Sequence, residues 1–318
     1  MRRVLLVAVA LLYATSAFAE TYPSRPIRII VPTPPGGPVD VMARLLANAL
    51  PATLGQPVFV ENKPGAGNTI GSRQAAQAEP DGYTLMVSAA SGMIMSPLIY
   101  KNAGYDATSF AAVAMIAETP QVLVVNPNFP AKSVAELIAA AKANPGKLNY
   151  STGGAGTLPH LNAELFKTLA GVNIQHVPYK GGGPSLTAVM AGEVQMTFDT
   201  VSTSLQLIRE GKVRALAIVG PKRVLELPDV PTMPEAGFPA VTSGAWTALL
   251  APKDTPPEIV ARLNAATNAA LQSEQMKGVL AKLGAEPRGG TPQQLTDHMA
   301  HETKKWAPIV AKLDLKAE

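Results

Sequence analysis

The sequence predicts an α/β fold of two lobes, each a mainly parallel sheet flanked by helices, joined by a hinge of two segments. Three observations predict it. Strand patterns alternate with helical patterns along most of the 318 residues, which is typical of parallel sheets covered by helices on both faces. A proline-rich stretch interrupts this alternation late in the chain. The length also suffices for two domains that each bury a core of their own.

The amino-terminal part establishes the alternation. Ile27 to Val31 is a continuous β-branched run that Pro32 ends, as expected of a buried parallel strand. A helix follows over residues 41–50, with its apolar side chains on one face. Further strands are predicted at residues 58–61, 84–88, 113–116 and 122–125.

The middle of the chain continues the pattern. Ser133 is the predicted cap of a helix that runs to Ala143, because a serine side chain can accept from the free amides of a first turn. The other helices are predicted at residues 158–169, 186–190 and 203–209, and the strands at residues 148–151, 174–177, 194–198 and 216–219.

Residues 221–239 contain five prolines and only short apolar pieces, which indicates a linker or crossing segment. A strand at residues 246–250 follows, then helices at 257–271 and 276–283. A last helix begins behind Thr291 and runs toward Leu313, with Pro308 as an expected kink.

One insertion explains this order. Residues 20–122 and 242–318 would form lobe 1, and residues 123–241 would form lobe 2. The chain then crosses twice between the lobes, and these crossings act as a hinge about which the lobes close on a ligand. Two consecutive domains divided near residue 122 are the alternative.

The first nineteen residues have the layout of a secretory signal peptide. Arg2 and Arg3 precede an apolar run at residues 4–13, and Ala17-Phe18-Ala19 supplies small residues for cleavage. The run is shorter than the roughly 20 residues that span a bilayer. We therefore expect cleavage after Ala19 and a periplasmic location; an uncleaved membrane anchor is the alternative.

Charge and cysteine content exclude several classes of protein. The formal net charge of +4 includes Arg2 and Arg3, and the remaining cations are scattered, so neither a nucleic-acid stripe nor a polybasic membrane patch is predicted. The chain has no cysteine. This excludes disulfides, thiolate metal sites, a cysteine nucleophile and a lipid-modified cysteine.

Nothing in the sequence predicts an enzyme, a cofactor or a metal site. His298 and His301 lie beside Glu302, but no third cluster of ligands accompanies them. They are therefore better interpreted as polar side chains on the surface of an amphipathic helix than as metal ligands. No G-x-S-x-G elbow is present, and carboxylates are sparse near the glycine-rich segments described next, so no acid–base pair is evident.

Three glycine-rich loops carry the strongest local signal: VPTPPGGPVD at residues 31–40, NKPGAGNTIG at 62–71 and STGGAGTLPH at 151–160. We call them loops 1, 2 and 3. A glycine-rich turn that feeds a helix leaves backbone N–H groups pointing outward, and these bind anions without a charged side chain. In parallel α/β sheets such loops gather at the carboxyl ends of the strands. Loops 1 and 2 fit neither a phosphate loop nor a dinucleotide fingerprint.

Loop 1 shows the pattern most clearly. The backbone turns at Gly36-Gly37, Pro38 stands at the first helical position, and Asp40 falls in the first turn, where a carboxylate complements the helix dipole. A plain strand–helix connector capped by Asp40 is the alternative.

The chain resembles the substrate-binding proteins of tripartite tricarboxylate transporters, the TctC-like or Bug family. The phrases that carry the resemblance extend from about residue 22 to 290: YPSRPIRIIVPTPPGGPVD, LGQPVFVENKPGAGNTIG, PDGYTL, NPGKLNYSTGG, HVPYKGGGPSLTAVMAGEVQMTFD, LPDVPTMPEAG and LGAEP.

The resemblance implies a two-lobed periplasmic binding protein of type II-like fold. It implies capture of a small carboxylate, whether a di- or tricarboxylate, an aromatic acid or an amino acid, for delivery to the permease subunits of a tripartite transporter, by a monomer. A loaded sensor component that docks on a membrane histidine kinase is the alternative.

The family holds a ligand carboxylate through backbone amides and ordered waters of loops 1 and 3. Carried over to this sequence, the resemblance implicates Pro35, Gly36, Gly37, Asp40, Gly65, Ala66, Gly67, Asn68, Gly153, Gly156, Thr157, His160, Tyr179, Lys180, Gly181 and Asp199.

Three of these residues have structural alternatives. Lys180 is better interpreted as a solvated charge on the rim. His160 can instead be a partner in a structural hydrogen bond, and Asp199 can be a helix cap rather than a receptor for a ligand amino group.

Three positions of loop 1 depart from the family pattern. Thr33 replaces a usual Tyr or Phe, Val39 replaces a usual Thr or Ser, and Pro38 lacks an N–H. The identity of the ligand therefore does not transfer from better-known members.

Overall fold

The computed structural model describes residues 22–154, 156–179, 181–282 and 284–312. The predicted signal peptide, Lys180 and the end of the last helix at Leu313 lie outside these residues. None of the described helices is both long and apolar enough to cross a membrane.

The described residues form one curled mixed sheet of ten strands, in the order β2-β1-β3-β9-β4-β7-β5-β6, with β8 and β10 also paired to β4. The strands are β1 (Ile27–Val31), β2 (Val58–Asn62), β3 (Thr84–Ala89), β4 (Phe110–Val125), β5 (Asn149–Thr152), β6 (Gln175–Pro178), β7 (Met196–Thr200), β8 (Arg214–Val219), β9 (Gly244–Pro252) and β10 (Glu286–Gly289).

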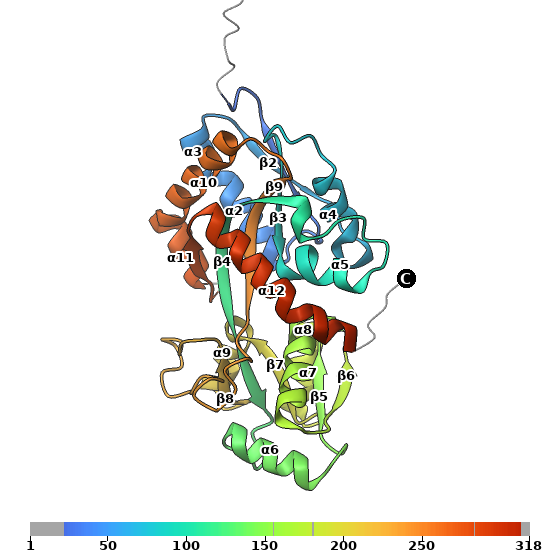
Figure 1. Ribbon diagram of the computed structural model, residues 1–318. Coiled ribbons are helices and arrows are strands. Elements are labelled where there is room, and N and C mark those ends of the chain that lie inside the picture. Colours follow the sequence, from blue (N-terminus) through green and yellow to red (C-terminus); the bar gives the residue numbers. More distant parts are fainter. Residues whose placement is uncertain (1–21, 155, 180, 283, 313–318) are drawn as a thin grey trace, which may run out of the picture.

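The long strand β4 belongs to two parts of this sheet. Residues 110–120 pair with β9, whereas residues 121–125 pair with β7 and β8. We call the part with β1, β2, β3, β9 and β10 lobe 1, and the part with β5 to β8 lobe 2. Figure 1 shows β4 running from one group of helices to the other.

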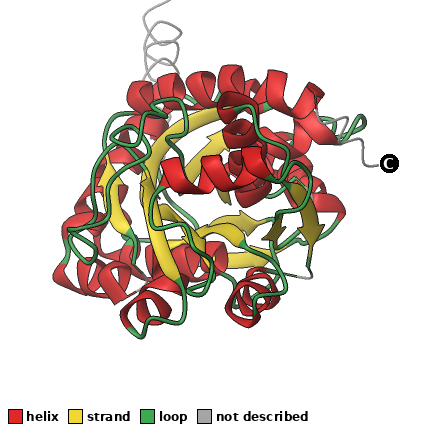
Figure 2. Ribbon diagram, turned by 90° about the horizontal axis from the view of Figure 1, so that it is seen from below, coloured by secondary structure: helices red, strands yellow, loops and turns green. Residues whose placement is uncertain are grey.

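Helices cover both lobes. Lobe 1 carries α2 (Pro38–Ala49), α3 (Pro51–Leu54), α4 (Thr69–Ala76), a π-helix at Ser91–Met95, α5 (Ser96–Ile99), α10 (Pro257–Gln272), α11 (Glu274–Lys282) and α12 (Pro292–Lys312). Lobe 2 carries α6 (Val134–Ala143), α7 (Leu158–Ala170), α8 (Gly182–Ala191) and α9 (Val201–Arg209). In Figure 2 these helices surround the strands.

The sheet is less parallel than its sequence pattern predicts. The trios β2-β1-β3 and β6-β5-β7 are parallel. However, β4 is antiparallel to β7, β8, β9 and β10, and β9 is antiparallel to β3. A strand buried on both faces has a continuous apolar pattern in either direction, so the sequence does not reveal the orientation. The two strands expected at residues 113–116 and 122–125 are also one strand.

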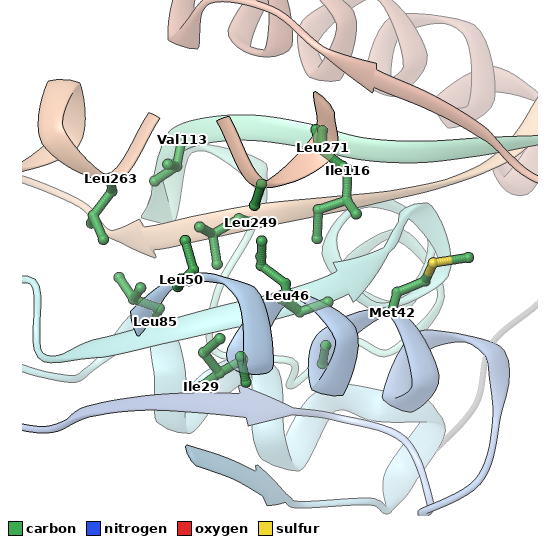
Figure 3. Packing of buried hydrophobic residues seen from close by; sticks show 14 of the residues in the cluster. Ile29, Met42, Leu46, Leu50, Leu85, Val113, Ile116, Leu249, Leu263 and Leu271 are labelled. Carbon is green, nitrogen blue, oxygen red and sulfur yellow. The ribbon is translucent and has the colours of Figure 1, made fainter. Parts of the chain in front are cut away.

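Strand β1 shows why the elements pack as they do. Ile27, Ile29 and Val31 belong to the core on one face of the sheet, and Ile30 belongs to the core on the other. All four side chains are fully buried. On the first face, Leu46 of α2 packs over the strands (Figure 3). Two further cores cover the faces of lobe 2.

The proline-rich segment contains no helix or strand among the described residues between β8 and β9. It is anchored through Thr232, which forms an isolated bridge with Ile218 of β8, and an ion pair of 3.0 Å between Arg223 Nε and Glu235 Oε2 joins two parts of the segment itself. The segment thus leads from lobe 2 back to lobe 1.

Replacing Leu249 by alanine tests the packing of the lobe 1 core. Leu249 is 0% exposed, whereas Leu225 is 94% exposed. We expect Leu249→Ala to lower the free energy of unfolding by about 2–5 kcal/mol, because it leaves a cavity. Leu225→Ala should change it by less than about 0.5 kcal/mol. Urea unfolding followed by circular dichroism measures both, and equal losses would contradict this packing.

Candidate functional site

Loops 1, 2 and 3 each follow the carboxyl end of a parallel strand, namely β1, β2 and β5. Loops 1 and 2 are joined directly. Asn62 Nδ2 donates to the Thr33 carbonyl over 3.1 Å, and the Lys63 amide donates to the Val31 carbonyl over 2.8 Å. The two loops therefore form one edge of lobe 1.

Loop 1 is shaped around a buried carboxylate. Gly36 has a φ of +81°, which favours glycine, and Gly37 caps α2 with an extended backbone. Asp40 is 2% exposed. Its oxygens accept from the Gly36 amide over 2.8 Å, from Arg44 Nε over 2.9 Å and from Asn62 Nδ2 over 2.8 Å.

These hydrogen bonds decide the charge of Asp40. Burial opposes its ionisation, but the bonds from Arg44, Gly36 and Asn62 outweigh burial and lower the pKa of Asp40 to about 2. Asp40 therefore stays ionised at neutral pH, and its hydrogen bonds stabilise the conformation of loop 1.

The structure corrects one expectation for loop 1. Because the Gly36 amide already donates to Asp40, it is not a free donor for an anion. The amides of Gly37, Val39 and Asp40 have no hydrogen-bond partner among the described residues. Pro35 is exposed beside them.

Loop 3 repeats this turn in lobe 2. Gly156 has a φ of +75°, and Thr157 caps α7 with an extended backbone. The Gly156 amide donates over 3.0 Å to Nδ1 of His160, four residues on. The amides of Thr157, Leu158 and His160 have no partner within the described part of the chain. The same turn thus occurs once in each lobe, with an imidazole in place of the carboxylate.

His160 makes a structural hydrogen bond, which was the alternative to a contact with the ligand. It is 4% exposed, and its Nδ1 accepts a hydrogen bond from the Gly156 amide, so this nitrogen carries no hydrogen of its own. Its ring stacks on His176 with a centroid distance of 4.1 Å and an interplanar angle of 15°. His176 Nε2 lies 2.7 Å from Thr152 Oγ1 at the end of β5.

Both rings favour the neutral form. Burial lowers the pKa of His160, against an opposing effect of Glu164. Burial and the neighbouring His160 lower the pKa of His176 to about 4. The stacked pair is therefore uncharged at neutral pH, and this state keeps loop 3 in place.

A fourth segment, which contains Tyr179 and Gly181, hydrogen-bonds to loop 3. The Gly181 amide donates to the Gly153 carbonyl over 3.1 Å, and the Tyr179 amide donates to the Thr152 carbonyl over 2.9 Å. A Cβ on Gly153 would lie 2.9 Å from the Gly181 carbonyl carbon, so only glycine fits there. The Tyr179 hydroxyl bonds to Glu193 instead, which leaves the main chain of Tyr179 beside the loop.

Loop 2 has an unusual backbone. Gly65, Ala66, Gly67 and Asn68 all have positive φ, at 132°, 44°, 59° and 77°. Such a conformation is strained for Ala66, and strain of this kind is concentrated at functional sites. The turn is held because Ser96 Oγ donates to the Gly67 carbonyl over 2.5 Å.

The sequence gives no signal for one part of the site. The carboxyl end of α5 lies between two loops: a Cβ on Gly156 would come within 2.8 Å of Ile99 Cδ1, and a Cβ on Gly67 would meet the ring of Tyr100. Loops 2 and 3, from different lobes, therefore both approach α5. Ile99 and Tyr100 lie in an apolar stretch that indicates only a helix end.

Asp199 lies where β7 leads into α9. Its Oδ2 accepts from the hydroxyls of Thr203 and Ser204 in the first turn of that helix. Burial raises the pKa of Asp199. These contacts are made to hydroxyls and not to backbone amides, and Thr200 is the N-cap of α9, so both alternatives for Asp199 stay predictions. No group of three His, Cys, Asp or Glu side chains suited to a metal occurs among the residues that the structure describes.

Comparison with known proteins identifies relatives of this chain. Residues 42–315 match the family model described as tripartite tricarboxylate transporter family receptor. Protein BugT of Bordetella pertussis is 41% identical over 308 residues, which cover 95% of this chain and 94% of BugT.

Two solved structures of relatives contain ligands. An R. palustris protein with adipate is 38% identical, with a TM-score of 0.76, and the match covers 92% of this chain and 98% of that one. MatC from Rhodopseudomonas palustris with bound malate is 35% identical, with a TM-score of 0.74, and the match covers 91% and 100% of the two chains.

The histidine pair predicts an acid-sensitive stability. A base whose pKa is about 4 in the folded state and about 6.5 in the unfolded state binds more protons when unfolded. The pair therefore stabilises the fold fully above about pH 6.5, and this contribution falls as the pH drops toward 4.

Replacing His176 by glutamine should flatten the dependence of the melting temperature on pH between 7 and 4. We expect the acid-induced loss to shrink by about 1 kcal/mol, allowing for the partial exposure of the ring. His301→Gln, at an exposed position, is the matched control and should leave the profile unchanged. An unaltered profile for His176→Gln would show that the pair does not titrate as argued.

Proposed function

The chain belongs to the tripartite tricarboxylate transporter receptor family, and from this premise we propose that it is an exported periplasmic solute-binding protein. It captures a small carboxylate between its two lobes, as a monomer, and delivers it to the permease subunits of a tripartite transporter. It has no catalytic role. The signal-peptide layout at its amino terminus, with cleavage after Ala19, supports export.

One observation carries this proposal: the same helix-starting turn occurs in both lobes. Loop 1 starts α2, loop 3 starts α7, and each leaves first-turn amides without a partner among the described residues. The amino-terminal end of a helix stabilises a negative charge by up to about 2 kcal/mol in a partly buried setting. Two such ends can hold one carboxylate between the lobes.

The donors suit a protein that must release its ligand. Asp40 is already neutralised by Arg44, and His160 is neutral, so neither side chain needs a ligand as its counter-ion. Main-chain amides and ordered waters bind a carboxylate as neutral donors. Release then separates no buried ion pair, whose breaking would leave an uncompensated charge.

We further propose that the lobes divide at residues 122/123 and 241/242 and close about these crossings. Two features support this. β4 exchanges its partner β9 for β7 and β8 between Pro120 and Gln121. The returning chain enters β9 at Gly244, directly opposite Pro120.

Dicarboxylates are the first ligand class to test, because relatives were solved with adipate and with malate. In a thermal-shift screen of the mature chain, we expect at least one small acid to raise the melting temperature. At 100 times Kd the stabilisation would be about 2.7 kcal/mol. The neutral diamide of adipic acid is the control. No shift with any acid, or an equal shift with the diamide, would contradict recognition of a carboxylate.

Replacing Gly37 by leucine separates binding from folding. Gly37 has a φ of −75°, and the atom nearest to a Cβ there would be the Pro34 carbonyl oxygen at 3.7 Å. A side chain therefore fits, but it stands beside the free amides. Gly36 is a poorer choice, because its φ of +81° strains any other residue.

We expect Gly37→Leu to weaken the affinity for the best acid more than tenfold, about 1.4 kcal/mol, while the free protein stays folded and loses no more than the roughly 1 kcal/mol that a poorer N-cap costs. Gly278→Leu, in α11 where nothing lies within 4 Å of a Cβ, is the matched control. Calorimetric titration measures both, and wild-type affinity in Gly37→Leu would remove loop 1 from the site.

A further inference from the structure

The two chain crossings between the lobes meet at a buried set of polar side chains. Gln121 is the first residue of β4 that pairs with lobe 2, and Ser243 directly precedes β9. Gln121 is 1% exposed and Ser243 is 5% exposed. Within the described part of the chain, neither side chain hydrogen-bonds to the other crossing, but both bond to the same third residue.

That third residue is Asn162 of α7, which is 0% exposed. Its Nδ2 donates to Gln121 Oε1 over 2.5 Å, and its Oδ1 accepts from Ser243 Oγ over 2.6 Å. An amide side chain presents a donor and an acceptor side by side, so Asn162 can serve both partners at once. Because all three groups are buried, losing any bond leaves a polar group without a partner, which is costly.

Helix α7 also begins at loop 3. Asn162 follows His160 by two residues, a rise of about 3 Å along the helix. Between them, Leu161 packs in a core cluster of lobe 1 that includes Trp246 and Trp306. The helix that carries the loop 3 amides is therefore fixed at its first turns to both crossings and to lobe 1.

A second contact holds the same crossing from lobe 1. Lys305 of α12 donates from Nζ to the Thr242 carbonyl over 2.6 Å, and its charge is balanced by Glu302 at 3.8 Å. Ser243 is thus anchored on both sides, by Lys305 through its neighbour and by Asn162 through its own hydroxyl.

We infer that Asn162 is a positioning residue that sets the relative placement of the two lobes for ligand capture, by tying the helix of loop 3 to both crossings. It does so without touching the ligand. Rotation about the crossings moves Gln121 and Ser243, and their bonds to Asn162 carry α7 along. This inference rests on the proposed function.

The distance between the lobes can be measured directly. The chain has no cysteine, so Lys142→Cys in α6 and Glu274→Cys in α11, both exposed, accept a pair of spin labels, one per lobe. Pulsed electron resonance then gives the distribution of interlobe distances. Calorimetric titration with adipate gives the affinity of the same variants.

Asn162→Leu is the test variant and Asn264→Leu is its matched control. Asn264 also bonds two segments, the Val113 and Gly290 carbonyls over 2.7 and 2.8 Å, but both belong to lobe 1. Leucine preserves the approximate shape of either side chain. A purely structural role for Asn162 would make the two variants behave alike.

We expect Asn162→Leu to broaden the ligand-free distance distribution and to weaken adipate binding at least tenfold. Asn264→Leu should keep a narrow distribution and bind within twofold of the parent. Equal behaviour of the two variants would overturn the inference. If Asn162→Leu does not fold, Ser243→Ala is the test variant. We expect it to broaden the ligand-free distance distribution and to weaken adipate binding at least threefold. A distribution and an affinity like those of the parent would overturn the inference.

Failure of the proposed function gives a different result. If the parent protein binds neither adipate nor any other acid of the screen, the carboxylate proposal fails. The ligand-free distance distributions then decide alone. Broadening in Asn162→Leu but not in Asn264→Leu supports the role of Asn162, and its absence overturns that role.

Discussion

The candidate site depends on one hydrogen bond that occurs twice. In each lobe a glycine amide donates to a side chain four residues later, from Gly36 to Asp40 and from Gly156 to His160. The bond turns the backbone at the glycine and fixes the start of the following helix. The next amides, which cannot bond within a helix, are then left at the edge of the sheet. Without this bond the glycine-rich loops would have no fixed set of donors.

The two copies of the turn differ in how they respond to acid. Asp40 remains a carboxylate because Arg44 and Asn62 also donate to it, whereas His160 accepts only while its ring is neutral. The hydrogen bond that shapes loop 1 is therefore kept in acid, whereas the one that shapes loop 3 depends on a neutral His160. Loop 3 also begins the helix that is tied to the crossings, since α7 reaches both of them through Asn162. Helix α7 therefore carries both the acid-sensitive His160 and Asn162, which bonds to the crossings.

The sequence predicted the local elements well and their long-range relations less well. The run Ile27–Val31 and the cap at Ser133 follow from local chemistry and are observed. The antiparallel direction of β4 was not predictable, because a strand buried on both faces has the same pattern in either direction. The glycine loops were found from the sequence, but the use of the Gly36 amide by Asp40 was not. Asn162 gave no signal, since its partners are 41 and 81 residues away.

A crystal structure of the mature chain with bound adipate tests the central claim most directly. We predict carboxylate oxygens at about 2.7–3.2 Å, directly or through one water, from first-turn amides of both α2 and α7. A ligand bound elsewhere and held by arginine side chains, with loops 1 and 3 facing solvent, would contradict it.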